Sequence, residues 1–284
     1  MTQLKTHMIG LGISVAMIAV AASAEAPPLP GEDSTEQAAL AAATHGKGFG
    51  PQSPRDIDNH NGSNPQIFGF APEATRMTLC NIHLHESAEH KGGEFTTYAG
   101  DRDARGDETG FKYNGTLSPA ELAPLDHKVG EGENGDLIPG DTVEAHFVYS
   151  TAQATPGPGL TSCFTEAVHN PQLRVEAVIG VLVNDPNAAN FAEMARFQNI
   201  GGLYQLPNLP GDLGVPTVYN GSTTGAVYDE KGSPMQVTWS VRPKVVKIDI
   251  TSLDGWLKDN PFHEQSAHHV RNLVTDPALL SKIE

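Results

Sequence analysis

The chain is organised around the stretch Asn81-Ile82-His83-Leu84-His85-Glu86-Ser87-Ala88-Glu89-His90. In a strand, successive side chains point to opposite faces, so Asn81, His83 and His85 share one face, and Ile82 and Leu84 share the other. The two histidines then lie about 7 Å apart along the backbone, which lets both imidazoles reach one metal ion. The alternative is an ordinary pair of histidines near a strand end.

A second predicted strand, 142–150, supplies a third imidazole. Glu144, His146 and Val148 share one of its faces. Three neutral imidazoles leave zinc one open position for water, which is the catalytic rather than the structural arrangement. Nitrogen ligands also suit zinc better than magnesium or calcium. We therefore predict that His83, His85 and His146 bind Zn²⁺.

Each of these strands carries a polar residue two positions before a ligand histidine, on the same face. Asn81 precedes His83, and Glu144 precedes His146. A ligand imidazole needs a hydrogen-bond partner on its second ring nitrogen, which sets its tautomer and direction. We predict these roles for Asn81 and Glu144.

The N-terminus has the layout of a secretory signal peptide. Lys5 precedes an apolar run from Met8 to Val20, and small residues follow it. We expect a signal peptide over residues 1–24, with cleavage after Ala24 or Ala26, and a periplasmic or secreted protein. An uncleaved anchor is the alternative, but the apolar run is short for a membrane span of about 20 residues. No later segment is apolar enough to cross a bilayer, so we expect no stable membrane insertion after cleavage.

The chain has two cysteines, Cys80 and Cys163, and in an oxidising compartment they most simply form one disulfide. By alternation Cys80 lies on the strand face opposite the histidines, so the bridge would brace the metal-bearing strand from behind. A thiolate metal ligand is the alternative. It would require a reduced sulfur on the other face of the strand.

Composition describes a globular, turn-rich chain. The 284 residues are 38% hydrophobic and include 29 Gly and 21 Pro. The formal net charge of −16 repels nucleic acid and anionic lipid, so we expect neither as a partner.

Strands outnumber helices along the chain. Residues 27–47 are a Pro-, Ala- and acid-rich lead-in, and 173–183 is the apolar run of a central buried strand. Helices are expected over 187–199 and 252–258. The sequence thus predicts a mainly β, α+β fold: a single domain built on a large twisted, mostly antiparallel sheet with a few short peripheral helices. The other expected strands cover residues 75–85, 142–150, 236–242 and 245–250.

Two families share parts of this pattern. His83-x-His85-x₃-Glu89 followed by Pro139-Gly140-Asp141 and His146 resembles the two cupin motifs, in which Glu89 would be a fourth ligand of iron or manganese. The glycines that cupins need are absent six residues before His83 and seven after Glu89.

Other segments resemble carbonic anhydrases. The alpha-class signatures match, in order, Gln52-Ser53-Pro54-Arg55-Asp56-Ile57, Ser87-Ala88-Glu89-His90, Glu144-Ala145-His146-Phe147-Val148, Ala177-Val178-Ile179-Gly180, and Tyr219 through Thr224 with Val237-Thr238-Trp239. The chain departs from that class in lacking the Asn-Asn-Gly-His element and the proline after the threonine pair. The sequence motif Cys80-Asn-Ile-His-Leu-His-x₃-Glu-His, together with a second cysteine, resembles the delta class of carbonic anhydrases more than the alpha class.

That resemblance implies a carbonic anhydrase-like catalytic domain over residues 48–284 and reversible hydration of CO₂ to bicarbonate by zinc-bound hydroxide. Thr223 would accept the hydrogen bond of the hydroxide and donate its own to ionised Glu89. Val148 and Val178 would wall the CO₂ pocket, with Thr224 at its mouth.

Three points stay open at this stage. The proton could leave through His60, His90 or His127, or through water or buffer. The alternatives to a carbonic anhydrase are a cupin-like iron or manganese enzyme and a non-catalytic, exported zinc-binding protein.

Overall fold

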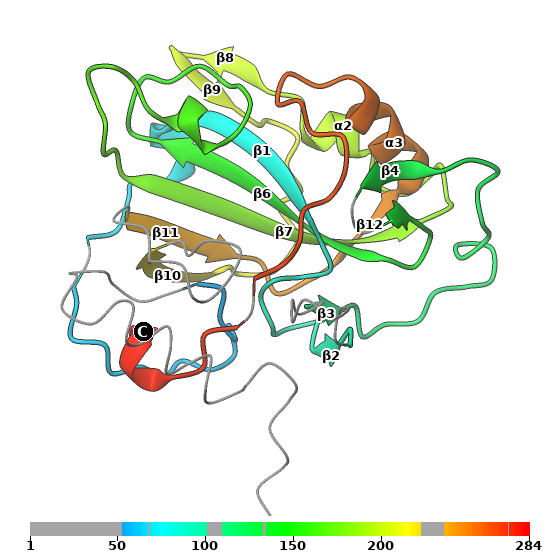
Figure 1. The fold of residues 1–284 in the computed structure, drawn as a ribbon, viewed down its shortest axis with the longest axis horizontal. Helices are drawn as coiled ribbons and strands as arrows, with labels where there is room; N and C mark the ends of the chain where they lie inside the picture. Colours follow the sequence, from blue (N-terminus) through cyan, green and yellow to red (C-terminus); the bar gives the residue numbers. More distant parts are fainter. Residues whose placement is uncertain (1–52, 68, 101–109, 133–134, 223–235, 272) are drawn as a thin grey trace, which may run out of the picture.

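The computed structural model describes residues 53–67, 69–100, 110–132, 135–222, 236–271 and 273–284 (Figure 1). The predicted signal peptide, the lead-in over 27–47, and Thr223 and Thr224 lie outside the described residues. Within the described part of the chain, no helix is both long and apolar enough to span a membrane.

One six-stranded sheet forms the centre of the molecule. Its strands run in the order β1-β6-β7-β11-β10, and β12 pairs with β7 beyond the end of β11. The pairs β1/β6, β6/β7 and β10/β11 are antiparallel, whereas β11 and β12 both run parallel to β7. The predicted mainly β fold on one large sheet is confirmed, and the sheet is mixed. Its strands are β1 (Thr78–Glu86), β6 (Thr142–Ser150), β7 (Leu173–Val183), β10 (Thr217–Ser222), β11 (Gln236–Val241) and β12 (Val246–Asp249).

Short elements surround this sheet. Three two-stranded ribbons pair β2 (Thr97–Tyr98) with β3 (Phe111–Lys112), β4 (Val129–Gly132) with β5 (Gly135–Leu137), and β8 (Gln198–Ile200) with β9 (Leu203–Gln205). The helices are α2 (Phe191–Met194) and α3 (Ile250–Lys258), with 3₁₀ turns η1 (Ala74–Arg76), η2 (Leu160–Cys163) and η3 (Pro277–Leu279).

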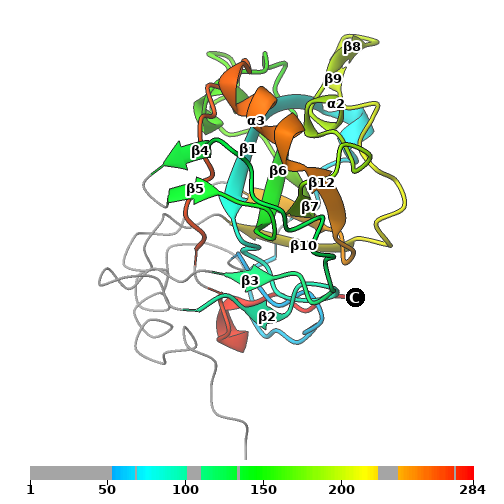
Figure 2. The ribbon, with the colours of Figure 1, turned by 90° about the vertical axis from the view of Figure 1, so that its right-hand side faces the viewer.

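Apolar side chains cover both faces of the central strands. On one face, β1, β6 and β7 pack under α2 and α3, with Phe191 and Trp256 in edge-to-face contact. A second cluster, around Val148, Val175 and Trp239, fills the other face. Figure 2 shows α3 on one side of the sheet and the β2–β3 ribbon on the other. All eleven residues of β7 are buried, as its mostly apolar sequence predicts.

The register of β1 against β6 shifts between Leu79 and Asn81, at a β-bulge. The bulge interrupts the alternation of faces, because it leaves one residue of β1 without an opposite partner. Leu79 therefore packs with Leu84 in the cluster under the helices, while Cys80 packs in the Val148 cluster. The prediction that Cys80 lies on the face opposite the histidines is wrong for this reason.

The predicted disulfide is confirmed: Cys80 is bridged to Cys163 at the end of η2. Because Cys80 packs on the face that carries the histidines, the bridge fastens η2 over that face rather than bracing the strand from behind. The loop it closes is long, with a sequence separation of 83.

Two segments differ from the sequence prediction. The helix expected over 187–199 is a single turn, α2, because its last residues form strand β8 instead. Residues 217–222, which are not among the strands expected from the sequence, form β10 and pair with β11. In both places, pairing with another strand overrides the local sequence preference: β8 pairs with β9, and β10 pairs with β11.

Candidate metal centre

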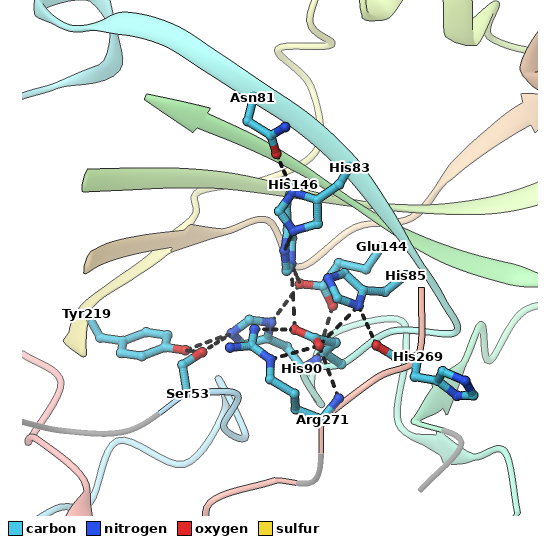
Figure 3. Close-up of polar contacts among 11 residues, drawn as sticks. Ser53, Asn81, His83, His85, His90, Glu144, His146, Tyr219, His269 and Arg271 are labelled. Atoms are coloured by element: carbon cyan, nitrogen blue, oxygen red, sulfur yellow. Dashed lines mark hydrogen bonds and ion pairs between the residues drawn. The ribbon is translucent and has the colours of Figure 1, made fainter. Parts of the chain in front are cut away.

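Three histidines converge at the middle of the β1/β6 pair (Figure 3). His83 stands directly opposite His146 in the register, and His85 lies two residues further along β1 on the same face. One nitrogen of each ring lies within 4.8 Å of one nitrogen of the other two, and the ring centroids are 4.7–5.2 Å apart. The structure thus brings the three predicted ligands together.

The outer nitrogen of each ring donates to an acceptor. The Nδ1 of His83 donates to the Oδ1 of Asn81 at 2.7 Å, and the Nδ1 of His85 to the carbonyl of His269 at 2.7 Å. The Nε2 of His146 donates to the Oε1 of Glu144 at 2.8 Å. Asn81 and Glu144 therefore lie where the sequence predicts them, beside the two histidines that they were expected to orient.

These hydrogen bonds assign the tautomers, because each acceptor takes the only ring proton of a neutral imidazole. The lone pairs of His83 Nε2, His85 Nε2 and His146 Nδ1 then face one another. His83 Nε2 and His146 Nδ1 are 3.2 Å apart, and the buried His85 Nε2 has no hydrogen-bond partner among the residues that the structure describes. Three converging lone pairs suit a cation, so the residues fit the predicted zinc ion.

Burial disfavours the protonated forms of His83 and His85. It is the largest cause that lowers the pKa of His83 well below its usual range, and neighbouring imidazoles lower it further. Burial also lowers the pKa of His85 to about 3, against the opposing effect of the Glu89 carboxylate. A metal needs the unprotonated ring, so the site is already in its binding state at neutral pH.

A buried hydrogen-bond chain extends behind His146. Glu144 accepts from His146, from the Nδ1 of His90 at 2.7 Å and from the backbone N–H of His90 at 3.1 Å. The Nε2 of His90 pairs with the hydroxyl of Tyr219 at 2.7 Å, and Ser53 bonds to the same hydroxyl at 2.8 Å. His90 is fully buried, so its ring does not itself contact solvent.

Glu89 lies behind the three histidines rather than among them. Its oxygens approach the Nδ1 of His85 at 3.2 Å and the Nε2 of His146 at 3.9 Å, which are the nitrogens turned away from the cluster. Its principal partner is Arg271, which donates through its backbone N–H and through two guanidinium nitrogens. Burial alone would raise the pKa of Glu89, but Arg271 and His85 lower it to about 2.

A cavity of about 390 Å³ opens onto the histidines. Val148 lies in its wall, as predicted, together with Leu173, Val175 and Val237. Val178 does not lie there: it packs on the opposite face of the sheet, in the cluster under the helices. The alternation of β7 places Val175 on the cavity side and Val178 away from it.

The family model of the delta carbonic anhydrases matches residues 74–252, more than half of the chain. The chain belongs to the delta carbonic anhydrase family. It is therefore an enzyme of the carbonic anhydrase type, with CO₂ and bicarbonate as its small-molecule substrate class. The matched residues include all three converging histidines and Glu89, and exclude Ser53 and Arg271.

Solved structures similar to the chain are also carbonic anhydrases. One is an alpha-carbonic anhydrase from Thermovibrio ammonificans in complex with the inhibitor sulfanilamide. Its sequence is 15% identical, the match covers 80% of this chain and 84% of that chain, and the TM-score is 0.26. Another is the Photobacterium profundum alpha-carbonic anhydrase (16%, 78% and 85%, TM-score 0.26). A third is a hyperthermostable carbonic anhydrase identified from an active hydrothermal vent chimney (16%, 86% and 94%, TM-score 0.25).

These three resemblances are distant, and the family assignment rests on the family model alone. A comparison with curated proteins gave no match.

Sequence reasoning missed the contribution of the C-terminal segment to this carbonic anhydrase site. The segment pairs with β1 through His268, whose backbone N–H donates to Leu84 and whose carbonyl accepts from Glu86. It brings the His269 carbonyl and Arg271 to the site, and Glu264 and His268 to the cavity wall. No local pattern marks it, because residues 259–271 form neither helix nor named strand.

His268 is the most exposed of the imidazoles that line the cavity. Its ring centroid lies 6.0 Å from those of His83 and His85, and about half of its side chain is exposed. Its Nε2 pairs with Glu264 at 2.6 Å, and this hydrogen bond is the largest cause that raises the pKa of His268. The candidates His60 and His127 do not line the cavity.

Proposed function

We propose that this delta carbonic anhydrase is an exported zinc enzyme that reversibly hydrates CO₂ to bicarbonate and a proton. The observation that carries the proposal is the geometry of three imidazole rings. One nitrogen of each ring converges with those of the other two, and the second nitrogen of each ring is hydrogen-bonded to an acceptor. Zinc held by such a set lowers the pKa of a bound water to about 7 and so supplies a nucleophile at neutral pH.

The residues of the chain prepare the site for this reaction. Asn81, Glu144 and the His269 carbonyl aim the three imidazoles. The apolar wall with Val148 admits neutral CO₂ and disfavours charged bicarbonate, which helps the product to leave. Two roles come from the family resemblance alone and concern residues outside the described ranges. Ionised Glu89 would accept the hydroxyl proton of Thr223, so that this hydroxyl could accept a hydrogen bond from the nucleophile and orient it, and Thr224 would belong to the pocket mouth.

The proton leaves through His268. It is the most exposed imidazole of the cavity wall, and Glu264 stabilises its protonated form. A proton carrier needs a pKa near the working pH and access to both the site and the solvent.

Export agrees with the Cys80–Cys163 disulfide, because disulfides form and persist in oxidising compartments such as the periplasm or the cell exterior. The signal peptide over residues 1–24 is the proposed route. The cupin-like alternative has less support, since Glu89 faces the outer nitrogens of His85 and His146 and holds Arg271.

The test is metal content and CO₂ hydration on one sample. The oxidised protein is stripped of metal, reloaded with zinc, iron or manganese, and assayed by stopped flow. We expect activity with zinc at one ion per chain, and its loss in His146→Ala. Activity with iron or manganese but not zinc would favour the cupin-like alternative. Stoichiometric zinc without hydration would show a non-catalytic zinc-binding protein.

A further inference from the structure

The β-bulge of β1 connects the Cys80–Cys163 disulfide to the metal site. The register of β1 against β6 skips Cys80, and the carbonyl of Cys80 accepts a hydrogen bond from the backbone N–H of Gly157 at 3.1 Å. The next residue, Asn81, donates from its amide nitrogen to the carbonyl of Gly157 at 3.2 Å, while its Oδ1 accepts the Nδ1 proton of His83. Gly157 therefore bonds to two consecutive residues of β1, one that forms the disulfide and one that orients a ligand histidine.

The segment that carries Gly157 buries little apolar surface of its own. The ladder between β1 and β6 already joins the chain up to Ser150, so in the folded protein the disulfide restrains residues 151–162 rather than the whole loop between the cysteines. Among these residues, the buried side chains are those of Ala152 and Ala154. Two methyl groups stabilise a segment only slightly. Residues 151–162 are therefore held mainly by the disulfide and by hydrogen bonds.

The position of Gly157 selects the orientation of the Asn81 amide. An amide that turns by half a revolution exchanges its oxygen for its nitrogen. The oxygen accepts the Nδ1 proton of His83 and leaves the Nε2 lone pair for a metal. The nitrogen would donate to Nδ1 instead, and the ring proton would then occupy Nε2 and block the metal. Because the Gly157 carbonyl accepts from the amide nitrogen, it holds the first orientation.

We propose that the Cys80–Cys163 disulfide controls the zinc affinity of the site by holding Gly157 beside Asn81. Reduction by a dithiol breaks the S–S bond and gives each cysteine sulfur one electron and one proton, while the dithiol is oxidised to its own disulfide. The segment is then released, the Asn81 amide turns, and zinc affinity falls. Zinc loading thus follows oxidation of the cysteines. This inference rests on the proposed zinc site.

Zinc affinity with and without the disulfide tests the proposal, by competition with a chromophoric chelator. Cys80→Ala combined with Cys163→Ala should lower the affinity about tenfold in the protein with Asn81. Asn81→Asp offers an acceptor oxygen in either orientation, so in this background the same loss of the disulfide should change the affinity by less than about twofold. The alanines leave no thiol that binds zinc itself.

Two further measurements do not depend on zinc. ¹⁵N NMR of the metal-free protein should show His83 with its proton on Nδ1 when the disulfide is present. It should show a mixture of tautomers in C80A/C163A and in wild-type protein reduced with dithiothreitol, and no mixture when Asn81→Asp is also present. The free energy of unfolding should fall on loss of the disulfide in both backgrounds.

The matched control is Arg174→Met, which breaks the buried ion pair with Glu176 away from the cavity. It should lower the free energy of unfolding and leave zinc affinity unchanged.

Equal losses of zinc affinity in the Asn81 and N81D backgrounds would overturn the proposal, because the disulfide would then act on the fold and not on the amide. Unchanged affinity in C80A/C163A would also overturn it, as would unfolding of both disulfide-free forms, which would make the bridge a requirement of the fold. Oxidised wild-type protein that binds no zinc would instead refute the proposed function.

Discussion

Asn81 accepts the Nδ1 proton of His83 while its own amide nitrogen donates to the carbonyl of Gly157 at 3.2 Å. The second bond prevents the amide from turning its nitrogen towards the imidazole. The orientation of His83 therefore depends on a side chain that a metal would never touch. Such outer partners typically contribute 10- to 100-fold to metal affinity.

Replacing Asn81 should therefore weaken zinc binding in proportion to the loss of the acceptor. Asn81→Leu removes the acceptor, and we expect about a tenfold or greater loss of zinc affinity. Asn81→Asp keeps an oxygen towards His83 and serves as the control, with affinity near that of the wild type. Competition with a chromophoric chelator measures both. Equal losses in the two variants would show that Asn81 acts by packing and not by accepting the proton.

Residue spacing alone allowed the prediction that His83, His85 and His146 converge, because the period of a strand is fixed and both ligand strands are regular near the histidines. The same rule failed for Cys80, and the prediction for Val178, which did not come from this rule, was also wrong. For Cys80 a bulge changed the alternation of faces. For Val178 the resemblance to the alpha class pointed to a residue that the alternation of β7 places on the opposite face.

The C-terminal segment is the element that sequence reasoning could not place. Its residues contribute to the site through contacts with β1, and these contacts join positions about 180 residues apart, such as His85 and His269. Loop residues without periodicity carry no signal for such pairing. Because the segment lies along the open edge of β1, it completes the cavity wall with Glu264, His268 and Arg271.

This segment should also determine how the proton leaves. Raising the pH through the pKa of His268 frees the imidazole to accept a proton, so hydration that is limited by proton transfer should rise with pH. Glu264→Gln removes the carboxylate that raises this pKa, and the rising limb should move to lower pH. Stopped-flow rates across pH, with the His268 titration followed by NMR, measure both effects.

His268→Ala is the companion variant. It should lower kcat in weak buffer about tenfold, with recovery in concentrated imidazole, because a small carrier replaces the missing ring. The exposed His60→Ala is the matched control and should leave the rate unchanged. A loss in H268A that imidazole buffer does not restore would mean that His268 supports the fold of the segment and carries no proton.

At the scale of the whole molecule, one face of the sheet carries a buried polar centre beside the apolar cluster around Val148, Val175 and Trp239. The β1/β6 pair carries three imidazoles and Glu144, and the adjacent carboxylate of Glu89 is fully buried with Glu144. A domain tolerates buried polar groups only when they are paired. Here the outer nitrogen of each histidine is hydrogen-bonded, and the inner nitrogens of the three rings converge on one another. In the fold without metal, burial therefore opposes protonation of His83 and His85, so acid conditions favour the unfolded chain.

That arrangement predicts acid sensitivity in the apo protein. The pKa of His85 is about 3 in the fold, against about 6.5 in the unfolded chain. The unfolded state thus binds a proton that the folded state excludes, and the contribution of His85 to stability is present above pH 6.5 and lost as the pH falls towards 3. Burial depresses the pKa of His83 in the same direction, so the two histidines act together.

Urea unfolding of the apo protein at several pH values should therefore show a free energy of unfolding that declines below pH 6.5. His85→Gln removes one of the groups responsible, and the slope between pH 6 and pH 4 should decrease by about one proton, or about 1.4 kcal/mol per pH unit. An unaltered slope in H85Q would mean that His85 accepts a proton in the folded apo protein, and that its nitrogen is not held ready for the metal.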